Sequence, residues 1–351
     1  MNDFAKKLKV AVVGASGLVG EKILNLLENE NFYGGNPLIF TSDKSAGKTF
    51  KFKNRRLKAN VLTENSFYGI DIALFATSEC VSKKFVPFAL KSNATVIDNS
   101  TAFRLKKGVP LIVPEVNFNA YTGQKLIANP NCSTIQSVIP LYVLEKDFGI
   151  KSVVCATYQA VSGSGKTGLN ELFISRKASK NLSGEFFGCD IKNNCIPKIG
   201  EYLPSGFTTE ENKMLCESRK ILGKPRLNLS AFCARVPAEN CHGVFLRVKL
   251  KRDFCLNEVI SAFKNSSEIK LVLPRDNNSP DCPINALAND THEVFIGRIR
   301  KNPLEKNVIE FYAVADNLLR GAAYNAVLIA RKVAEKIAEK TQTIACEKAL
   351  K

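Results

Sequence analysis

The sequence predicts an α/β protein built from two domains, and three features of the residue pattern support this. Short apolar runs alternate with helix-like segments over the first third of the chain, which is typical of a parallel sheet with helices on both faces. A glycine-rich turn directly follows the first apolar run. Beyond residue 132 the alternation weakens, which favours a mixed α+β sheet. With 351 residues, each domain can have its own core.

The first domain is expected to contain parallel strands joined by helices. The strands are expected at residues 8–13, 37–41, 70–76 and 95–98. A turn at 14–20 separates the first strand from a helix that reaches about Asn29, because Val19, Ile23 and Leu26 recur at helical spacing.

The second domain is expected to contain strands separated by irregular segments. Strand-like runs occupy residues 151–158, 228–236, 243–250 and 308–315, and loop-rich insertions occupy 180–210 and 274–290. From Asp316 to about Lys340, apolar residues such as Leu319 and Ala326 follow helical spacing. This last segment is expected to form a long amphipathic helix that could return to the first domain.

Composition and charge restrict the class of protein. The net charge of +17 suits anionic small molecules, whereas the basic residues do not interleave with aromatic ones as a nucleic-acid surface requires. The eleven cysteines occur singly, without zinc-finger spacing, and the apolar run at 10–13 is too short for a secretory signal. No segment is long and apolar enough to span a membrane. We therefore expect a cytoplasmic protein with reduced thiols and no bound metal.

The turn after the first strand has the spacing G-x-x-G-x-x-G, formed by Gly14, Gly17 and Gly20. Glycines at this point let the backbone approach a pyrophosphate, which then rests on the N-terminus of the following helix. The alternative is a tight turn without a ligand. The position directly after a buried strand favours a Rossmann-like dinucleotide site.

The end of the second strand indicates which dinucleotide is bound. An acidic residue there would bind a ribose 2′-hydroxyl, and a basic residue accommodates a 2′-phosphate. Lys44, between Ser42 and Ser45, suits the phosphate, although Asp43 would suit the hydroxyl. This pattern favours NADP over NAD.

Cys132 stands where a helix is expected to begin, after Pro130 and before apolar residues at helical spacing. A thiol in the first turn of a helix lies among unpaired N–H groups that favour the thiolate and can bind an oxyanion. The alternative is a small buried hydrophobic residue. The segment therefore offers a candidate nucleophile together with an oxyanion site.

Three further features lie in the second half of the chain. Residues 162–167 resemble a phosphate-binding P-loop, but Ala160 replaces its first glycine, so we interpret them as a flexible active-site turn. Arg235 could pair with a substrate carboxylate. His242 is one of only two histidines and could act as an acid or base, although a single histidine is more often structural.

Five segments together resemble the aspartate-semialdehyde dehydrogenase family. They are residues 129–134, 98–104, 113–117, 158–163 and 315–323, and they follow the family's order from about residue 8 to 340. N-acetyl-glutamyl-phosphate reductase has a similar architecture, but its cysteine segment typically carries Pro-Gly-Cys where this chain has Pro130, Asn131 and Cys132.

The resemblance implies a role for each matching residue. Cys132 would be the nucleophile, His242 the acid/base, and Gln159 would orient the substrate or thioester. Phosphate would be bound by Arg104 and Lys213 and framed by Asn131, the α-carboxylate would be bound by Arg235, and the amine by Glu210 or, alternatively, Glu211. The cofactor would contact Gly14, Ala15, Ser16, Gly17, Leu18, Val19, Ser42, Lys44, Ser45, Thr77, Ser162, Gly163 and Asn317, with Asn317 at its nicotinamide end.

The chain departs from the family pattern at two places. Glu79 follows Thr77 and Ser78 where small residues are usual, and it would repel a pyrophosphate unless its side chain turns away. Gly243 and Val244 follow His242 where the family commonly has Ser-Glu. Neither change removes a reacting group.

The resemblance implies an NADP-dependent, phosphorylating aldehyde dehydrogenase. It would reduce L-aspartyl 4-phosphate to L-aspartate 4-semialdehyde through a thioester on Cys132, in the biosynthesis of lysine, threonine, methionine and isoleucine. Residues 1–131 would bind NADP, residues 132–315 would form the catalytic and dimerisation domain, and residues 316–351 the returning helix of a homodimer or homotetramer. The alternatives are a reductase of N-acetyl-glutamyl phosphate or of an acyl-CoA, and a nucleotide-binding regulator without turnover.

Overall fold

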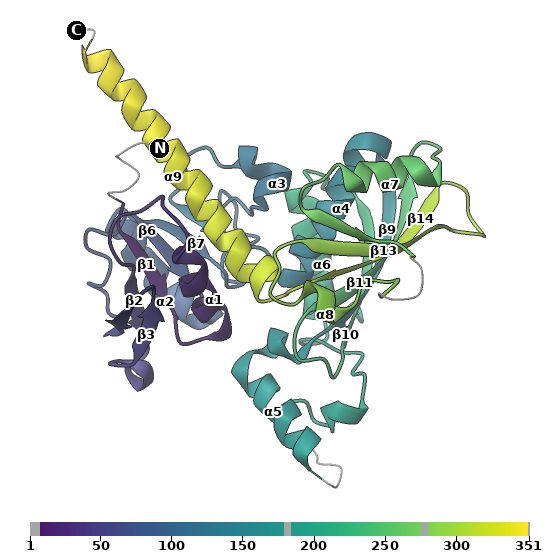
Figure 1. The fold of residues 1–351 in the computed structure, drawn as a ribbon, viewed down its shortest axis with the longest axis horizontal. Coiled ribbons are helices and arrows are strands. Elements are labelled where there is room, and N and C mark those ends of the chain that lie inside the picture. Colours follow the sequence, from purple (N-terminus) through teal and green to yellow (C-terminus); the bar gives the residue numbers. More distant parts are fainter. Residues whose placement is uncertain (1–7, 179–183, 275–279, 350–351) are drawn as a thin grey trace. The chain divides into compact units, whose positions relative to one another are not determined.

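The computed structural model describes residues 8–178, 184–274 and 280–349, and these residues form two compact units. Unit 1 comprises residues 1–130 and 322–351, and unit 2 comprises residues 131–321. The α/β class and the contrast between a parallel and a mixed sheet are confirmed (Figure 1). Within the described ranges, no helix has both the length and the apolar character needed to cross a membrane.

The sheet of unit 1 is parallel, with strand order β5-β2-β1-β6-β7-β8. These strands are β1 (Val10–Val13), β2 (Leu38–Thr41), β5 (Asn60–Val61), β6 (Ile72–Phe75), β7 (Thr95–Asp98) and β8 (Leu126–Ala128). The four expected strands are therefore present. The sequence prediction missed the short strands β5 and β8 and the separate antiparallel ribbon of β3 (Thr49–Phe52) and β4 (Arg55–Lys58).

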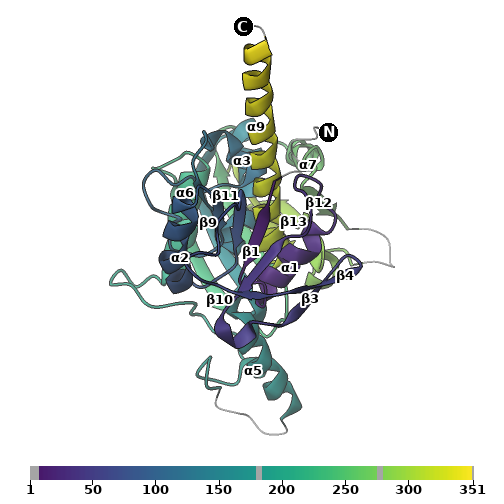
Figure 2. The ribbon, with the colours of Figure 1, turned by 90° about the vertical axis from the view of Figure 1, so that its left-hand side faces the viewer.

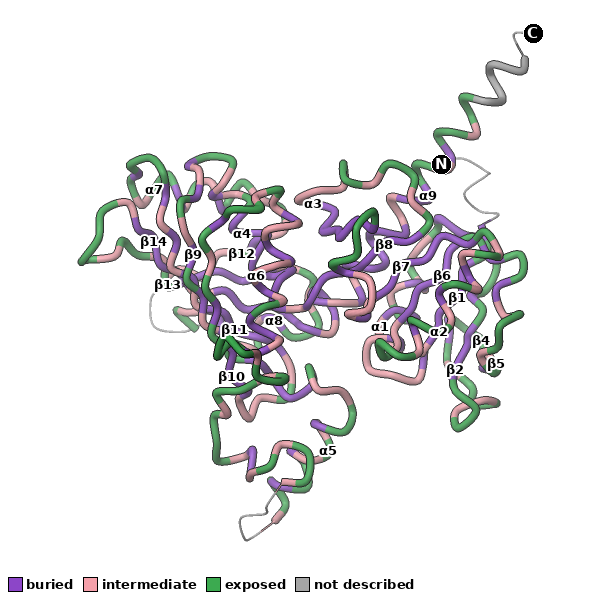
Figure 3. Tube along the Cα trace, turned by 180° about the vertical axis from the view of Figure 1, so that it is seen from behind, coloured by how far each residue is buried: buried purple, intermediate pink, exposed green. Residues whose placement is uncertain are grey.

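Alternating side chains bury both faces of this sheet, as the buried colour along β1, β6 and β7 shows (Figure 3). One face belongs to the core that includes α1 (Leu18–Leu27) and α9 (Tyr324–Ala349). α2 (Glu79–Lys91) contacts β7, and Figure 2 shows it on the other side of β1 from α1. The helices on both faces explain why the strands read as continuous apolar runs.

The last helix begins later than the sequence predicts. Asp316 accepts hydrogen bonds from the N–H groups of Leu318 and Leu319 at 2.9 and 2.8 Å, and its backbone carbonyl accepts one from Gly321 at 2.9 Å. A five-residue π turn, Leu319–Ala323, follows, and α9 begins only at Tyr324. Because Asp316 caps this turn, it does not start the α-helix itself. α9 also continues beyond Lys340, to Ala349.

The sheet of unit 2 is mixed, with strand order β10-β9-β11-β14-β13-β12. Its strands are β9 (Ile150–Gln159), β10 (Asn228–Arg235), β11 (His242–Leu250), β12 (Ile269–Val272), β13 (Val294–Lys301) and β14 (Val308–Ala315). β9 pairs parallel with β10 and antiparallel with β11, which also pairs antiparallel with β14. The four expected strands are confirmed, and β12 and β13 were missed.

One face of this sheet is covered by helices. α4 (Cys132–Phe148), α6 (Thr209–Ile221) and α7 (Leu256–Lys264) contact its strands. On β9, Val153, Cys155, Thr157 and Gln159 are buried, whereas Val154 and Tyr158 between them are 45% and 43% exposed. Since successive side chains of a strand point to opposite faces, the second face of the sheet is partly exposed and apolar at β9, whereas α8 (Asn285–Ala288) contacts β13 and β14.

Shorter elements connect these layers. α3 (Pro114–Asn117) and the 3₁₀ turns Asp43–Ser45 and Phe118–Ala120 belong to unit 1, and α5 (Gly165–Lys177), α8 (Asn285–Ala288) and the 3₁₀ turns Val161–Ser164 and Ile191–Asn193 belong to unit 2. The predicted turn at 162–167 is therefore a 3₁₀ turn followed by the start of a helix. Of the predicted insertions, residues 180–183 and 275–279 lie outside the described residues, as does the N-terminal segment 1–7.

Candidate active site

Cys132 occupies the first turn of a capped helix. α4 begins at this residue, as the sequence predicts, and Asn131 is the N-cap. The side-chain oxygen of Asn131 accepts hydrogen bonds from the N–H groups of Ser133 at 3.0 Å and Thr134 at 3.2 Å. The helix dipole at this position favours the thiolate form of Cys132. Cys132 is half-buried, so part of its side chain is accessible to a ligand.

A buried glutamate lies beside this cap. Glu210 in α6 accepts hydrogen bonds from the side-chain amides of Asn131 at 2.8 Å and Gln159 at 3.3 Å. Lys213 lies 3.2 Å from its other carboxylate oxygen. Burial raises the pKa of Glu210, but the charge of Lys213 and these hydrogen bonds outweigh it, so the pKa lies below the ordinary 4.5. The ionised carboxylate therefore links α4, β9 and α6.

The neighbouring Glu211 stabilises the start of α6. Its side chain accepts hydrogen bonds from the backbone N–H groups of Thr208 at 2.7 Å and Cys233 at 3.0 Å, and it completes a capping box with Thr208. Both carboxylate oxygens of Glu211 therefore bind backbone groups. Of the two neighbouring glutamates, Glu210 is the one that contacts Gln159.

Arg235 and Gln159 are brought together by strand register. They are paired residues at the ends of the parallel strands β10 and β9, and both are buried. Gln159 alternates with Tyr158, so it points to the face that carries α4 and α6. The sheet thus directs both side chains toward the helix that begins at Cys132.

One backbone peptide connects Arg235 with His242. The guanidinium Nη1 of Arg235 donates to the carbonyl oxygen of Ala160 at 2.7 Å, and the N–H of Ala160 donates to Nδ1 of His242 at 3.0 Å. Complete burial and the charge of Arg235 hold the pKa of His242 well below 6.5, although the backbone of Cys241 opposes this shift. His242 is therefore neutral at physiological pH. Burial also lowers the pKa of Arg235, which Glu210 and Cys132 counteract.

Two glycines keep the surroundings of these groups open. A Cβ at Gly163 would lie 2.9 Å from Nη1 of Arg235 and 3.1 Å from Nε2 of His242. A Cβ at Gly321 would lie 2.7 Å from the Cβ of Cys132. Side chains at either position would displace a proposed reacting group, so these two glycines are required by close approach.

Ser162 and Asn317 hold the backbone that precedes His242. The side-chain amide of Asn317 donates to the hydroxyl of Ser162 at 2.9 Å, and its oxygen accepts from the N–H of Cys241 at 2.9 Å. Cys241 has a backbone φ of 70°, a value that residues other than glycine rarely adopt. Asn317 therefore stabilises the unusual conformation from which β11 starts.

The glycine turn of unit 1 lies between β1 and α1. Gly14 has a φ of 87°, and a Cβ there would lie 2.3 Å from the carbonyl oxygen of Ala76, after β6. A Cβ at Gly20 would lie 2.3 Å from the carbonyl oxygen of Gly14, so α1 packs closely on the turn. Gly17 is the N-cap of α1. The turn thus has the tight packing and the helix N-terminus that a pyrophosphate site requires.

The other predicted cofactor residues of unit 1 follow adjacent strands. Ser42 precedes a 3₁₀ turn that contains Lys44 and Ser45, directly after β2. Lys44 is exposed. Thr77 follows β6, and its hydroxyl is hydrogen-bonded to Ser82 at 2.9 Å. Since β2, β1 and β6 are parallel neighbours, these residues and the glycine turn share the carboxyl edge of the sheet. In the sheet, β2 lies on one side of β1 and β6 on the other, so the strand order reverses direction at β1. In α/β sheets, ligands bind at the carboxyl edge beside such a reversal.

The two departures from the family pattern have structural explanations. The carboxylate of Glu79 lies 2.6 Å from Nζ of Lys83, which balances its negative charge. It also accepts a hydrogen bond from the hydroxyl of Thr101, which holds the side chain in this position. A Cβ at Gly243 would lie 1.8 Å from the hydroxyl of Tyr312. The position of Tyr312 therefore requires a glycine directly after His242.

Arg104 belongs to unit 1, whereas the other predicted substrate residues belong to unit 2. It is 8% exposed, and its Nη2 donates to the carbonyl oxygen of Asn99 at 2.8 Å. Unit 2 contains Asn131, Cys132, Gln159, Ser162, Gly163, Glu210, Lys213, Arg235, His242 and Asn317. Unit 1 contains residues 14–19, Ser42, Lys44, Ser45, Thr77 and Arg104.

Sequence reasoning missed three residues that support the site. Gln136 donates to the backbone carbonyl of His242 at 3.0 Å, and Glu217 accepts the N–H of Asn131 at 2.6 Å. Helical spacing could have identified both, since Gln136 lies four residues after Cys132 and Glu217 seven after Glu210. The third is Ala160, which acts through its backbone and therefore leaves no signal in the sequence.

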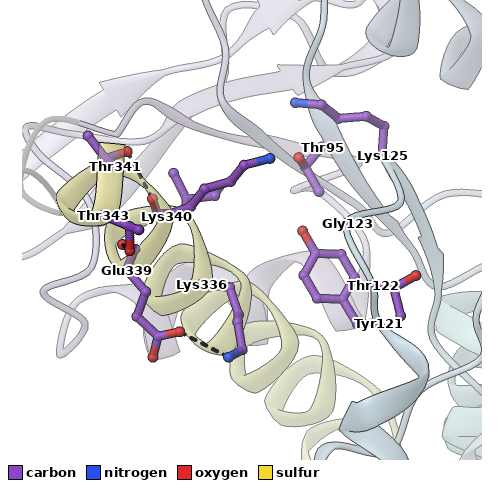
Figure 4. Close-up of a pocket in the computed structure, with 11 residues that line it drawn as sticks. Thr95, Tyr121, Thr122, Gly123, Lys125, Lys336, Glu339, Lys340, Thr341 and Thr343 are labelled. Atoms are coloured by element: carbon purple, nitrogen blue, oxygen red, sulfur yellow. Dashed lines mark hydrogen bonds and ion pairs between the residues drawn. The ribbon is translucent and has the colours of Figure 1, made fainter. Parts of the chain in front are cut away.

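A hollow elsewhere in unit 1 is distinct from this site. It has a volume of about 640 Å³ and lies beside the first residue of β7, Thr95, and the later turns of α9 (Figure 4). Lys336 in its wall is paired with Glu339 at 2.9 Å. Thr95 is at the amino edge of the parallel sheet, whereas the glycine turn is at the carboxyl edge. In the described ranges, no group of three His, Cys, Asp or Glu side chains could hold a metal ion.

Comparisons with known proteins show the family to which this chain is similar. Residues 9–124 match the family described as "Semialdehyde dehydrogenase, NAD binding domain", and residues 141–320 match "Semialdehyde dehydrogenase, dimerisation domain". Aspartate-semialdehyde dehydrogenase of Aquifex aeolicus is 40% identical over 92% of this chain and 96% of that protein. The Bacillus subtilis enzyme of the same name is 38% identical over 93% and 97%.

A solved structure shows the same fold. The crystal structure of aspartate semialdehyde dehydrogenase II from Vibrio cholerae, complexed with ASA, has a TM-score of 0.85 and 32% identity, and it covers 92% of this chain and 97% of that one. Two matching family descriptions cover most of the sequence, and the relatives are matched over nearly their whole length. The chain therefore belongs to the aspartate-semialdehyde dehydrogenase family.

Proposed function

We propose that this protein reduces L-aspartyl 4-phosphate to L-aspartate 4-semialdehyde and phosphate, with NADPH as the reductant and a thioester on Cys132 as the intermediate. The observation that carries the proposal is Cys132 in the first turn of α4, in the same unit as Gln159, Arg235 and His242. Membership of the family supports the choice of substrate. The reaction would serve the biosynthesis of lysine, threonine, methionine and isoleucine in the cytoplasm.

The first step is attack of the Cys132 thiolate on the acyl phosphate. The N–H groups of the first turn favour the thiolate, and the charge of Arg235 acts on it as well. The same N–H groups can stabilise negative charge on the substrate carbonyl. Loss of phosphate then leaves a thioester, which holds the acyl group in place for reduction.

The polar residues around Cys132 are proposed to hold the substrate. The guanidinium of Arg235 has five N–H donors, of which the Ala160 carbonyl takes one, so others can bind the α-carboxylate. Glu210 is ionised and suits the amine, and Gln159 beside it would orient the thioester. Lys213 and Arg104 supply charge for the phosphate, and Asn131 frames the same region.

A nicotinamide cofactor fits unit 1, and we propose that it is NADP. The glycine turn at residues 14–19 would hold the pyrophosphate, and Ser42, Lys44 and Ser45 after β2 would hold the 2′-phosphate. Thr77 lies at the same edge of the sheet. Ser162, Gly163 and Asn317 of unit 2 are also proposed to contact the cofactor, with Asn317 at its nicotinamide end. When bound, the cofactor supplies the hydride. We propose unit 1, residues 1–130 and 322–351, as the cofactor domain and unit 2, residues 131–321, as the catalytic one, so that both proposed boundaries lie within a few residues of those expected from the sequence.

The protein is also proposed to work as a homodimer or a dimer of dimers. Residues 141–320 match a family described as a dimerisation domain. On the partly exposed face of the unit 2 sheet, Tyr158 is exposed by 43% and Phe232 by 52%. Because strand register places both on the same face, a second copy of the chain is the proposed partner.

The test is phosphate-dependent reduction of NADP and NAD, measured in parallel with L-aspartate 4-semialdehyde as the substrate. We expect NADP to be reduced faster, and only when phosphate is present. Release of phosphate from L-aspartyl 4-phosphate and N-acetyl-glutamyl phosphate, each with NADPH, separates the two reductases. Preference for the N-acetylated substrate would contradict the assignment, and the absence of turnover with every substrate would indicate a binding protein.

A further inference from the structure

A buried aspartate ends β7 at the carboxyl edge of the parallel sheet. Asp98 is completely buried, and its two carboxylate oxygens bind side chains from different segments of unit 1. Oδ1 accepts the hydroxyl of Ser82 in α2 at 2.7 Å, and Oδ2 accepts the hydroxyl of Ser100, directly after β7, at 2.6 Å. One carboxylate thus joins the segment that follows β6 to the segment that follows β7.

The surroundings of Asp98 favour the ionised carboxylate. Burial raises the pKa of Asp98 above the ordinary 3.8, and the hydrogen bonds from Ser100 and Ser82 and the charge of Arg104 limit this shift. The backbone N–H of Ser100 also donates to Oδ1, at 3.3 Å. A buried carboxylate with several donors stays in place, because moving it would leave a charge and its donors without partners.

The Ser82 arm, formed by Asp98, Ser82 and Thr77, reaches the glycine turn. A carboxylate only accepts, so the one hydroxyl proton of Ser82 is donated to Asp98, and the 2.9 Å bond between Thr77 and Ser82 is donated by Thr77. The methyl group of Thr77 lies beside the turn, since a Cβ at Gly14 would lie 2.8 Å from it. The hydroxyl proton of Thr77 is used within the protein, so it does not also bind a phosphate oxygen of the cofactor.

The Ser100 arm, formed by Asp98 and residues 99–104, reaches Arg104. The hydroxyl of Ser100 donates to Asp98 and accepts the N–H of Ala102 at 3.1 Å. Two residues later, Nη2 of Arg104 donates to the carbonyl oxygen of Asn99 at 2.8 Å, which closes the segment on itself. Arg104 is therefore attached to Asp98 through a short, internally bonded loop.

We propose that Asp98 is a positioning residue that sets two ligand-binding segments of unit 1 independently, the cofactor segment through Ser82 and the phosphate segment through Ser100. The bonds of the two arms are a property of the fold, whereas the ligand assigned to each arm rests on the proposed function. Binding groups are effective only when bonds behind them hold their orientation, and Asp98 supplies these bonds for both segments.

The proposal differs from a purely structural role in one measurable respect. Ser82 and Ser100 each contribute one buried hydroxyl to the same carboxylate. If both only stabilised the fold, their removal would have similar effects on every ligand. If each arm sets one segment, removal of Ser82 should affect the cofactor alone, and removal of Ser100 should affect phosphate alone.

The test uses Ser82→Ala, Ser100→Ala and Asp98→Asn in the full-length protein. Michaelis constants for NADP and phosphate are measured in the phosphorylating direction. A hydrogen bond to a charged group corresponds to a factor of about ten or more, so we expect Ser82→Ala to raise the constant for NADP about tenfold and to leave that for phosphate unchanged. Ser100→Ala should give the reverse, and Asp98→Asn should raise both.

Ser66→Ala is the matched control, because it also removes a hydroxyl from unit 1. The hydroxyl oxygen of Ser66 accepts the N–H of Thr63 at 2.8 Å and belongs to neither arm. Both Michaelis constants should be unchanged in this variant. The melting temperatures of all four variants report how far each substitution destabilises the fold.

Equal changes in both constants for each serine variant, or no change in either, would overturn the proposal. Calorimetric titration of NADP and inorganic phosphate into the same variants gives binding constants without turnover. If the wild type does not turn over L-aspartate 4-semialdehyde, the proposed function fails, and the role of Asp98 is then decided by these binding constants. Weaker NADP binding in Ser82→Ala alone and weaker phosphate binding in Ser100→Ala alone would still support it.

Discussion

Individual residues in this site make several hydrogen bonds at the same time. Asn131 caps α4 with its side-chain oxygen, donates its side-chain amide to Glu210 and donates its backbone N–H to Glu217. These bonds fix the residue directly before the proposed nucleophile. Cys132 can therefore be altered without disturbing the cap, because none of these bonds involves its side chain.

Replacement of Cys132 tests the nucleophile. Cys132→Ala should abolish turnover, because no other side chain in the proposed site can form a thioester. Cys132→Ser should also be very slow, since an alkoxide is much harder to form than a thiolate. Steady-state rates and circular dichroism spectra of the three proteins provide the measurement. A substantial residual rate in correctly folded Cys132→Ala would exclude the thioester mechanism.

His242 should make the stability of the protein depend on pH. Its pKa is lowered in the folded state, so below the unfolded value of about 6.5 the unfolded chain binds a proton that the folded chain does not. The free energy of unfolding should therefore fall as the pH decreases from 6.5 toward the folded pKa, by up to about 1.4 kcal/mol per pH unit.

Urea titrations at pH 7 and below 6 measure this effect. His242→Gln should lack this part of the pH dependence, because glutamine does not titrate. His292→Gln is the matched control and should retain it, since His292 is exposed. Identical pH dependence in the wild type and His242→Gln would show that His242 is not held neutral by the fold.

At the scale of elements, the predictable parts are those in which local pattern and tertiary structure agree. The strand before Gly14, the helix after it and the start of α4 at Cys132 follow from apolar spacing and turn residues. The ribbon of β3 and β4 was missed because its sequence is rich in exposed Lys and Arg. β8 was missed because three residues are too short to show a period.

The candidate site shows the same division. Side chains such as Cys132, Gln159 and Arg235 could be proposed because their chemistry is visible in the sequence. The connection from Arg235 to His242 could not, because it passes through the peptide of Ala160, and any residue except proline would supply the same N–H. The cap at Asp316 could not be predicted from the sequence either, because it depends on the hydrogen bonds that its carboxylate accepts from Leu318 and Leu319.

The segment after β2 makes a prediction about cofactor choice. Lys44→Ala should raise the Michaelis constant for NADP far more than that for NAD, because a charge-assisted contact to the 2′-phosphate contributes about 1.5–3 kcal/mol. Lys44 is exposed, so the substitution should leave stability unchanged. Lys48→Ala, on the exposed residue four positions later, is the control. Equal effects on both cofactors would show that Lys44 does not contact the phosphate.

At the scale of the whole molecule, the sheet of unit 2 separates two tasks. The face covered by α4 and α6 carries Gln159 and Arg235, whose register brings them together. The opposite face carries Val154, Tyr158 and Phe232, which are 43–52% exposed. Alternation along one strand therefore assigns chemistry to one face and a proposed subunit contact to the other.

Charges introduced on the partly exposed face should separate the subunits. Tyr158→Glu combined with Phe232→Glu would place two carboxylates in a surface that a second copy is proposed to bury, and burying unpaired charge is strongly unfavourable. We expect the mass measured by light scattering after size exclusion to fall from that of an oligomer to that of one chain. Tyr68→Glu is the control, because Tyr68 is 93% exposed in unit 1 and its replacement should not change the mass. An unchanged mass in the double variant would show that the subunits associate through another surface.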